Sequence, residues 1–128
     1  MSDQQGTQGQ KKAIRLEVRM PLYSKARPRV TSRGVFMPKA YREKQKEMKR
    51  QLKEQWDGEP LEGPIYLELV LKGEGRADAD NIIGALMDAA NGLLWTDDRV
   101  TIIPRISVSW EKAPKADSLW RITIHDAG

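Results

Sequence analysis

Two pairs of carboxylates are the residues of this sequence best suited to chemistry. Asp78 and Asp80 stand two positions apart, and Asp97 and Asp98 are adjacent further along the chain. In extended backbone, residues two apart project to the same side, so Asp78 and Asp80 can share a metal ion. Magnesium is a hard cation that prefers such oxygen ligands. Such acids are suited to metal-assisted hydrolysis of a phosphate ester, but an Asp-x-Asp pair is a weak signal, and the spacing alone favours a structural role slightly more.

The same acids also have a purely structural interpretation, in which Asp80 caps a helix and Asp97-Asp98 forms a turn. A helix of about a dozen residues between the two pairs would separate them by about 18 Å. Asp97 or Asp98 can then return to the first pair in two ways: the following strand folds alongside, or a second subunit contributes. The spacing does not choose between them.

The rest of the composition excludes most other kinds of catalytic and metal site. The chain has 128 residues, no cysteine and one histidine, His125, which excludes disulfides, thiol nucleophiles and Cys-based metal sites. No apolar run approaches the roughly 20 residues that cross a bilayer. The polar segment 1–12 lacks the apolar core of a signal peptide, and we expect it to be a disordered tail. We therefore expect a soluble, cytoplasmic protein with no membrane partner and no small-molecule cofactor.

Charge is divided unevenly along the chain. Residues 11–50 hold 14 Lys and Arg against three Glu, whereas residues 51–128 hold eight Lys and Arg against 14 Asp and Glu. A basic half beside an acidic half indicates a polyanion-binding surface next to a carboxylate site, or else a solvated charged surface. The cations best placed to clamp phosphates without reading bases are Lys25, Arg27, Arg29, Arg33 and Lys39.

Hydrophobic periodicity predicts the elements that must position these groups. Period-two alternation predicts strands over residues 13–20, 65–72, 106–111 and 119–124, and helical spacing predicts helices over 38–56 and from about Asp80 to Asn91. A small hairpin is expected around Val30 and residues 35–37. The order is strand, helix, strand, helix, strand, strand. It predicts one α+β domain over residues 13–128, with a mixed sheet of about four strands, both helices on one side and a final hairpin. We expect Trp95, Trp110 and Trp120 in the core.

A longer signature makes the acids more specific. Asp78-Ala79-Asp80-Asn81 precedes an Ala- and Leu-rich helix containing Asp88-Ala89, and residues 92–98 read Gly-Leu-Leu-Trp-Thr-Asp-Asp. This combination resembles the RusA-type Holliday junction resolvases. Residues 25–29, Lys-Ala-Arg-Pro-Arg, and the Lys/Glu-rich helix are similar to the members carried by phages. The resemblance covers roughly residues 13–125.

The resemblance implies a homodimeric, magnesium-dependent endodeoxyribonuclease, with Mn²⁺ as a possible substitute. Such an enzyme resolves four-way DNA junctions by paired symmetric nicks in recombination and repair, and a two-fold dimer matches that symmetry. Asp78, Asp80 and Asp98 would be the catalytic, metal-holding acids, with Asp97 as the alternative third ligand. Arg76 joins the residues expected to bind DNA.

One position departs from the family's pattern, which usually has a lysine four residues after Asp80, where this chain has Gly84. Either another cation takes its place, with Arg76, Lys25 and Arg27 as candidates, or turnover is weak. Two alternatives therefore stay open. One is a non-catalytic dimeric protein that binds branched DNA and keeps the fold. The other is a sugar transferase that holds a metal–diphosphate through Asp-x-Asp, for which the chain is short.

Overall fold

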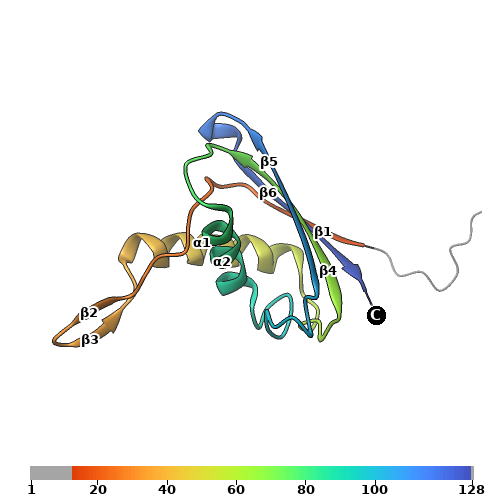
Figure 1. The fold of residues 1–128 in the computed structure, drawn as a ribbon, viewed down its shortest axis with the longest axis horizontal. Helices are drawn as coiled ribbons and strands as arrows, with labels where there is room; N and C mark the ends of the chain where they lie inside the picture. The colour runs from red at the N-terminus through yellow and green to blue at the C-terminus, as the bar shows by residue number, and fades with distance from the viewer. Residues whose placement is uncertain (1–12, 128) are drawn as a thin grey trace, which may run out of the picture.

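Alternating apolar residues in four segments form a mixed sheet with two helices beside it (Figure 1). The structure is a computed structural model and describes residues 13–127. In chain order its elements are β1 (Ile14–Val18), β2 (Arg29–Thr31), β3 (Gly34–Phe36), α1 (Lys39–Gln55), β4 (Ile65–Gly73), α2 (Ala79–Ala90), β5 (Arg105–Lys112), the 3-10 turn η1 (Lys115–Asp117) and β6 (Leu119–Asp126). They confirm the predicted α+β class, the element order and the small hairpin. The tail predicted over residues 1–12 lies outside the described residues.

The last strand of the chain lies inside the sheet. The strand order is β1-β6-β4-β5, with β6 antiparallel to both of its neighbours and β4 parallel to β5. The predicted final hairpin is therefore wrong. Parallel strands need a crossover connection, which α2 supplies between β4 and β5. The chain then passes back to the other side of β4, where β6 fills the gap beside β1.

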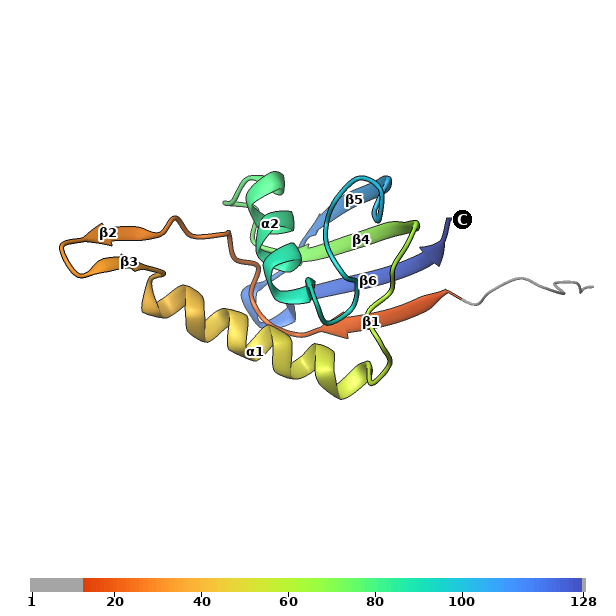
Figure 2. The same cartoon turned by 90° about the horizontal axis from the view of Figure 1, so that it is seen from below.

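Both helices cover one face of the sheet (Figure 2). Leu67, Leu69 and Leu71 of β4 point to that face and are at most 2% exposed, as period-two burial requires. From α1, Met48 and Leu52 pack against it and are fully buried. The buried residues of α2 are Ile82, Ala85, Leu86, Met87, Ala89 and Ala90. This packing fixes the position of both ends of α2. Neither helix in the described range is long and apolar enough to cross a membrane.

Side chains of α1 close the β1 edge of the sheet. The Gln55 amide accepts a hydrogen bond from the Glu17 N–H (2.9 Å) and donates one to the Glu17 carbonyl (2.7 Å). Gln51 does the same for Arg19, at 2.8 and 3.0 Å. An unpaired strand edge is a template for pairing with another chain. On β1, the amides of Gln51 and Gln55 bond to the backbone groups that would otherwise be free for such pairing.

The β5 edge has no such cover. Ile106, Val108 and Trp110 are 42%, 36% and 47% exposed, so the prediction that Trp110 lies in the core is wrong, while Trp95 and Trp120 are buried as predicted. The alternation of β5 resembles that of a half-buried strand. At the edge, however, the helices do not reach over it, because α2 packs above β4 and its buried neighbours.

A two-stranded ribbon extends away from the rest of the fold. β2 and β3 pair only with each other, with Val30 opposite Val35, and the hairpin projects beyond the end of α1 (Figures 1 and 2). Every residue of both strands is exposed. The hairpin therefore carries its side chains well away from the core.

Replacing Gln51 and Gln55 together with alanine is expected to lower the free energy of unfolding by about 1–2 kcal/mol, because buried hydrogen bonds contribute about 0.5–1.5 kcal/mol each and these are partly solvated. It should also increase self-association through the opened β1 edge. Chemical denaturation and light scattering measure the two effects. The control is Lys53→Ala on the same helix. A double variant as stable and as dispersed as that control would show that the glutamines do not protect the edge.

Candidate functional site

The first acid pair lies at the N-terminus of α2. Asp78 is the N-cap residue, in extended backbone with φ −71° and ψ 143°, and its carbonyl accepts hydrogen bonds from Asn81 and Ile82. Its carboxylate makes no capping bond. Asp80 lies within the first turn, where one carboxylate oxygen accepts the Asn81 N–H at 3.0 Å. The helix thus begins slightly before the predicted start, and Asp80 is not its cap. Both acids are exposed at the positive end of the helix dipole.

The second acid pair is positioned by a buried tryptophan. Trp95 is fully buried, and its indole N–H donates to the Asn91 side chain at 2.7 Å. The neighbouring backbone pairs with Leu61, which donates to the Leu94 carbonyl and accepts from Thr96, both at 2.9 Å. Contacts with the core therefore fix the position of the turn that follows α2. Asp97 and Asp98 come directly after this turn.

Asp97 and Asp98 have different surroundings. The Asp98 backbone N–H donates to one Asp97 oxygen at 2.8 Å, and Arg99 donates to the other at 2.9 Å. These interactions, the backbone bond first, hold the pKa of Asp97 below its ordinary value. Asp98 pairs with no cation among the described residues and is exposed. Of the two, Asp98 has the carboxylate that is not committed to an arginine.

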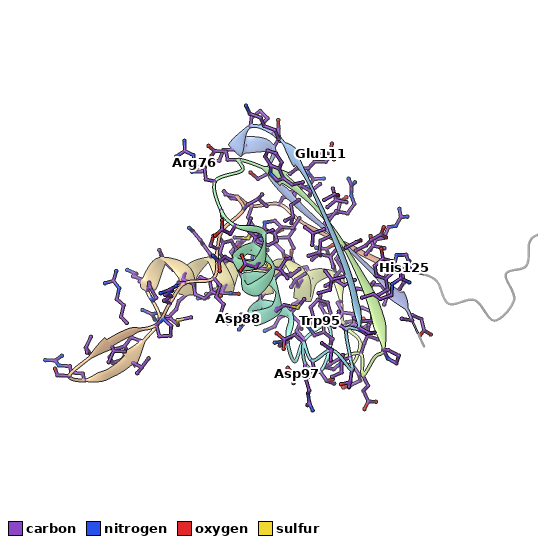
Figure 3. All side chains as sticks on the ribbon, in the orientation of Figure 1. Arg76, Asp88, Trp95, Asp97, Glu111 and His125 are labelled. Atoms are coloured by element: carbon purple, nitrogen blue, oxygen red, sulfur yellow. The ribbon has the colours of Figure 1, made fainter. Side chains whose placement is uncertain are left out.

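The two acid pairs do not meet within one chain. α2 separates them with 12 residues, a length of about 18 Å, and Figure 3 shows Arg76 and Asp97 at opposite ends of this helix. Over residues 13–127, no three His, Cys, Asp or Glu side chains gather as a metal site. The carboxylate donors suit a hard divalent cation. Of the two arrangements left open by the spacing, folding of the next strand therefore does not join the two pairs within the described residues.

Lys25 occupies the position next to Gly84. The Lys25 backbone N–H donates to the Asn81 carbonyl at 2.8 Å. Its side chain crosses the helix so that its Cδ lies 3.3 Å from where a Cβ on Gly84 would be. Its ammonium reaches Asp88 at 3.3 Å. Asp80, Gly84 and Asp88 are spaced at four-residue steps and so lie on one face of α2. A lysine from the N-terminal loop therefore lies across the glycine that replaces the family's usual lysine.

Asp88 links that lysine to α1. Its second oxygen accepts a hydrogen bond from the Tyr41 hydroxyl at 2.9 Å, and Gln45 donates to Tyr41 and to the Ala85 carbonyl. Burial, followed by the bond to Asp88, raises the pKa of Tyr41, so the phenol remains a donor at ordinary pH. Figure 3 shows Asp88 along α2, between the two acid ends. Sequence reasoning assigned Asp88 no role, because its partners are distant in the chain.

The remaining predicted DNA-binding residues are exposed and free of acidic partners. Arg29 lies on the β2–β3 hairpin, Arg33 on its turn, and Arg27 and Lys39 beside it. Within the described range none of them forms an ion pair, nor does Arg76 before α2. Their charges are available to an external anion.

Comparison with known proteins decides the family. Residues 20–124 match the family described as Endodeoxyribonuclease RusA. The chain belongs to the RusA endodeoxyribonuclease family. No curated protein matches it. The RusA match covers both acid pairs, Lys25 and the hairpin, and it identifies the activity as that of a nuclease of the Holliday junction-resolving kind. It therefore sets aside the sugar transferase considered from Asp-x-Asp alone.

Arg99→Ala is expected to raise the pKa of the Asp97 carboxyl toward its ordinary value without restoring it fully, because the Asp98 N–H remains bound. A carbon-detected NMR titration of the aspartates measures this shift. Arg105→Ala serves as the control, since the Arg105 guanidinium stacks on the Tyr66 ring. An unchanged Asp97 titration in Arg99→Ala would mean that the arginine does not engage this acid in solution.

Proposed function

We propose that this RusA-family protein is a magnesium-dependent endonuclease, able to use manganese, that resolves four-way DNA junctions by paired symmetric nicks. Asp78, Asp80 and Asp98 are its catalytic acids. The observation that carries this assignment is the charge environment of the three: each is exposed, and none pairs with a cation in residues 13–127. Asp97, by contrast, is committed to Arg99. A cytoplasmic role in phage or prophage recombination remains the prediction from the sequence.

The acids would hold the metal through carboxylate oxygens. A magnesium ion bound there would lower the pKa of an attacking water and neutralise charge on the phosphate. The chain's own contribution is orientation. Asp78, as the N-cap, and Asp80, in the first turn, both lie at the start of α2, where the free N–H groups of the helix can receive a phosphate oxygen. Trp95 keeps the turn of Asp98 in place.

A second copy of the chain completes the acid set in this proposal. One chain holds its two acid pairs at opposite ends of α2, so Asp98 of the partner subunit joins Asp78 and Asp80. The arrangement yields two identical sites related by a two-fold axis. A four-way junction is cut at two symmetric positions, which is the substrate geometry that such a dimer matches.

The hairpin and its flanks supply the DNA-binding charge. Between Val18 and Arg42 the chain has no acidic residue, and Arg27, Arg29 and Arg33 lie on or beside the projecting ribbon. Phosphate contacts of this kind give sequence-independent affinity that falls with salt. Together with Lys39 and Arg76 they hold the junction arms while the acids act.

Lys25 is the cation that compensates for Gly84. Its side chain lies over the glycine, one helical turn from Asp80, and Asp88 holds the ammonium there. Placed beside carboxylates that face a phosphate, an ammonium reduces the repulsion between them and stabilises the negative charge that develops on phosphorus. This role argues against the non-catalytic alternative, whose basis was the missing lysine.

Asp80→Asn is expected to abolish cleavage of a labelled four-way junction in magnesium while leaving junction binding intact or tighter, because one metal ligand and some repulsion are removed. Cleavage is measured on gels, and binding by gel shift in calcium or without metal. Asp117→Asn in η1 is a matched control at an acid that belongs to neither pair, and it should cut normally. Wild-type cutting by Asp80→Asn would remove Asp80 from the mechanism.

Lys25→Ala is expected to slow junction cleavage at saturating DNA by at least about tenfold, equivalent to about 1.4 kcal/mol of transition-state stabilisation. Adding Gly84→Lys should restore much of the rate, because the ammonium returns to the same place and the alanine leaves room for the new side chain. Single-turnover cleavage rates measure the effect.

Lys39→Ala is the control for Lys25→Ala and for its rescue by Gly84→Lys. It should weaken binding at low DNA without lowering the saturated rate, and Gly84→Lys should not rescue it. If Lys25→Ala cuts at the wild-type rate, or if Gly84→Lys fails to restore cleavage in a folded double variant, Lys25 does not serve this function.

A further inference from the structure

We propose that the β2–β3 hairpin is a wedge that enters the branch point of a DNA junction, where Val30, Val35 and Phe36 pack against base faces that have no stacking neighbour. A wedge of this kind would let the nuclease tell a junction from a duplex, and so it rests on the proposed function and deepens it. Four features of the hairpin support it: the exposure of these side chains, their placement on both faces of the ribbon, the charge around them and the short distance to α2.

The three apolar side chains of the hairpin stay exposed in the described chain. Val30 is 81% exposed, Val35 63% and Phe36 53%. Their strands pair only with each other, and the ribbon projects beyond the end of α1 (Figure 2), so packing within the subunit does not account for them. Apolar side chains that gather on one exposed element mark a surface that binds a partner.

The apolar side chains lie on both faces of the ribbon. Val30 is opposite Val35, and Phe36 is opposite Arg29 in the next pair. Because directly opposite residues share a face and successive residues alternate, the two valines lie on one face and Phe36 on the other. A flat partner would cover only one of these faces. Both are covered when the ribbon enters between two surfaces, such as the base-pair ends that face each other across the open centre of a four-way junction.

Hydrogen bonds and prolines hold the hairpin in one shape. The Thr31 hydroxyl donates to the Gly34 carbonyl at 3.2 Å and accepts the Arg33 N–H at 3.1 Å. Gly34 has φ +128°, a conformation that glycine adopts most easily. Pro28 and Pro38, whose φ is fixed by their rings, flank the two strands. An element that is already ordered loses little conformational entropy when it binds.

The charge around the apolar side chains favours DNA over another protein or a second copy of the chain. Arg27, Arg29, Arg33 and Lys39 lie on or beside the ribbon, and residues 19–41 contain no acid. Two such ribbons would repel each other. DNA offers phosphates to the cations and flat base faces to the apolar side chains. Base edges in an intact groove need hydrogen-bonding groups instead, which valine and phenylalanine lack.

A short segment ties the hairpin to the end of α2 that carries the first acid pair. The Lys25 N–H bonds to the carbonyl of Asn81 in the first turn of α2, and β2 begins four residues later at Arg29. Four extended residues span at most about 14 Å, and the three residues of β2 add about 10 Å. The tip therefore lies within about 24 Å of that turn, the length of about seven base pairs. One subunit can contact a branch point and a nearby phosphate at the same time.

A basic groove on α1 continues from the base of the hairpin. Its lining includes Met37, which follows β3, and the cations Arg42, Lys46 and Lys49. It also includes Asp88, the partner of the Lys25 ammonium. Cations along such a groove attract phosphates without reading bases. The groove thus offers the DNA backbone a path between the wedge and the proposed site.

Phe36→Ser is expected to weaken binding to a four-way junction by about tenfold, within the range for loss of one stacked base, and to change duplex binding by less than about twofold. Val30→Ser combined with Val35→Ser should act in the same way through the other face. Val100→Ser is the matched control, because Val100 is 78% exposed and lies outside the hairpin; it should leave both affinities unchanged. Gel shift without metal measures binding, and circular dichroism confirms folding.

Three results would exclude the wedge. Equal losses for junction and duplex would mean that the hairpin contacts only phosphates or a groove. Unchanged junction affinity in both hairpin variants, or an unmodified protein that does not prefer the junction, would also overturn it. Sedimentation without DNA tests the remaining occupant: a change in the oligomeric state of Phe36→Ser would assign these side chains to a contact between copies instead.

The base analogue 2-aminopurine, whose emission depends on its stacking, tests the location of the wedge. Placed at the branch point, it should change its emission when the unmodified protein binds, and saturating Phe36→Ser should produce little of that change. Placed in the middle of an arm, it should respond little to either protein. An equal change at the branch point with both proteins would show that Phe36 does not enter there.

Because none of these measurements requires cleavage, the wedge and the catalytic assignment can fail separately. If Phe36→Ser loses its preference for the junction while Asp80→Asn still cuts, the wedge stands and the assignment of the catalytic acids fails. If Asp80→Asn is inactive while Phe36→Ser binds the junction as tightly as the unmodified protein, the catalytic assignment stands and the wedge fails.

Discussion

The length and rigid packing of α2 constrain everything else about this site. The helix is buried against β4 along one side, so it cannot shift without disrupting the core. It holds one pair of carboxylates at its start and, through Trp95, another beyond its end. Because a helix is a rod with a fixed rise per residue, the acids of one chain are kept apart by the same contacts that position them. In the proposed dimer, the α2 helix of a second subunit would run the other way and bring unlike ends together.

At Gly84, a positive charge from another segment lies where the family usually has a lysine side chain. A side chain on a helix projects from a fixed point, but the volume it occupies can be reached from another segment. Lys25 enters that volume from the N-terminal loop, tethered by its backbone bond to Asn81, and Asp88 holds its ammonium. Tyr41 in turn orients Asp88 from α1. The local chemistry thus depends on three segments that are remote in the chain, and the glycine makes room for them.

The sequence was sufficient to predict the elements, because alternation and helical spacing are local properties: the residues of β4 and α1 carry unambiguous periods. It did not predict how the strands pair. The period of residues 106–111 fits a hairpin with the next strand as well as a parallel edge beside β4, so Trp110 was assigned to the core when it is exposed. The assignment of Asp78, Asp80 and Asp98 comes from their spacing and from family resemblance, and it stays a prediction. Lys25 was one of three cations named as candidates to replace the lysine at position 84, but its contacts with Gly84 and Asp88 were not predicted, because no local pattern encodes a contact between residues so far apart in the chain.

The central position of β6 in the sheet has a consequence for how the chain folds. β6 joins β1 to β4, and it ties the two ends of the fold together: Arg121 bonds to Glu17, 104 residues earlier. Contacts of such long sequence separation form late and slowly. A nascent chain still lacking these residues has two unconnected halves of a sheet. A chain truncated before β6 therefore lacks the strand that joins β1 to β4, and its sheet cannot form as one unit.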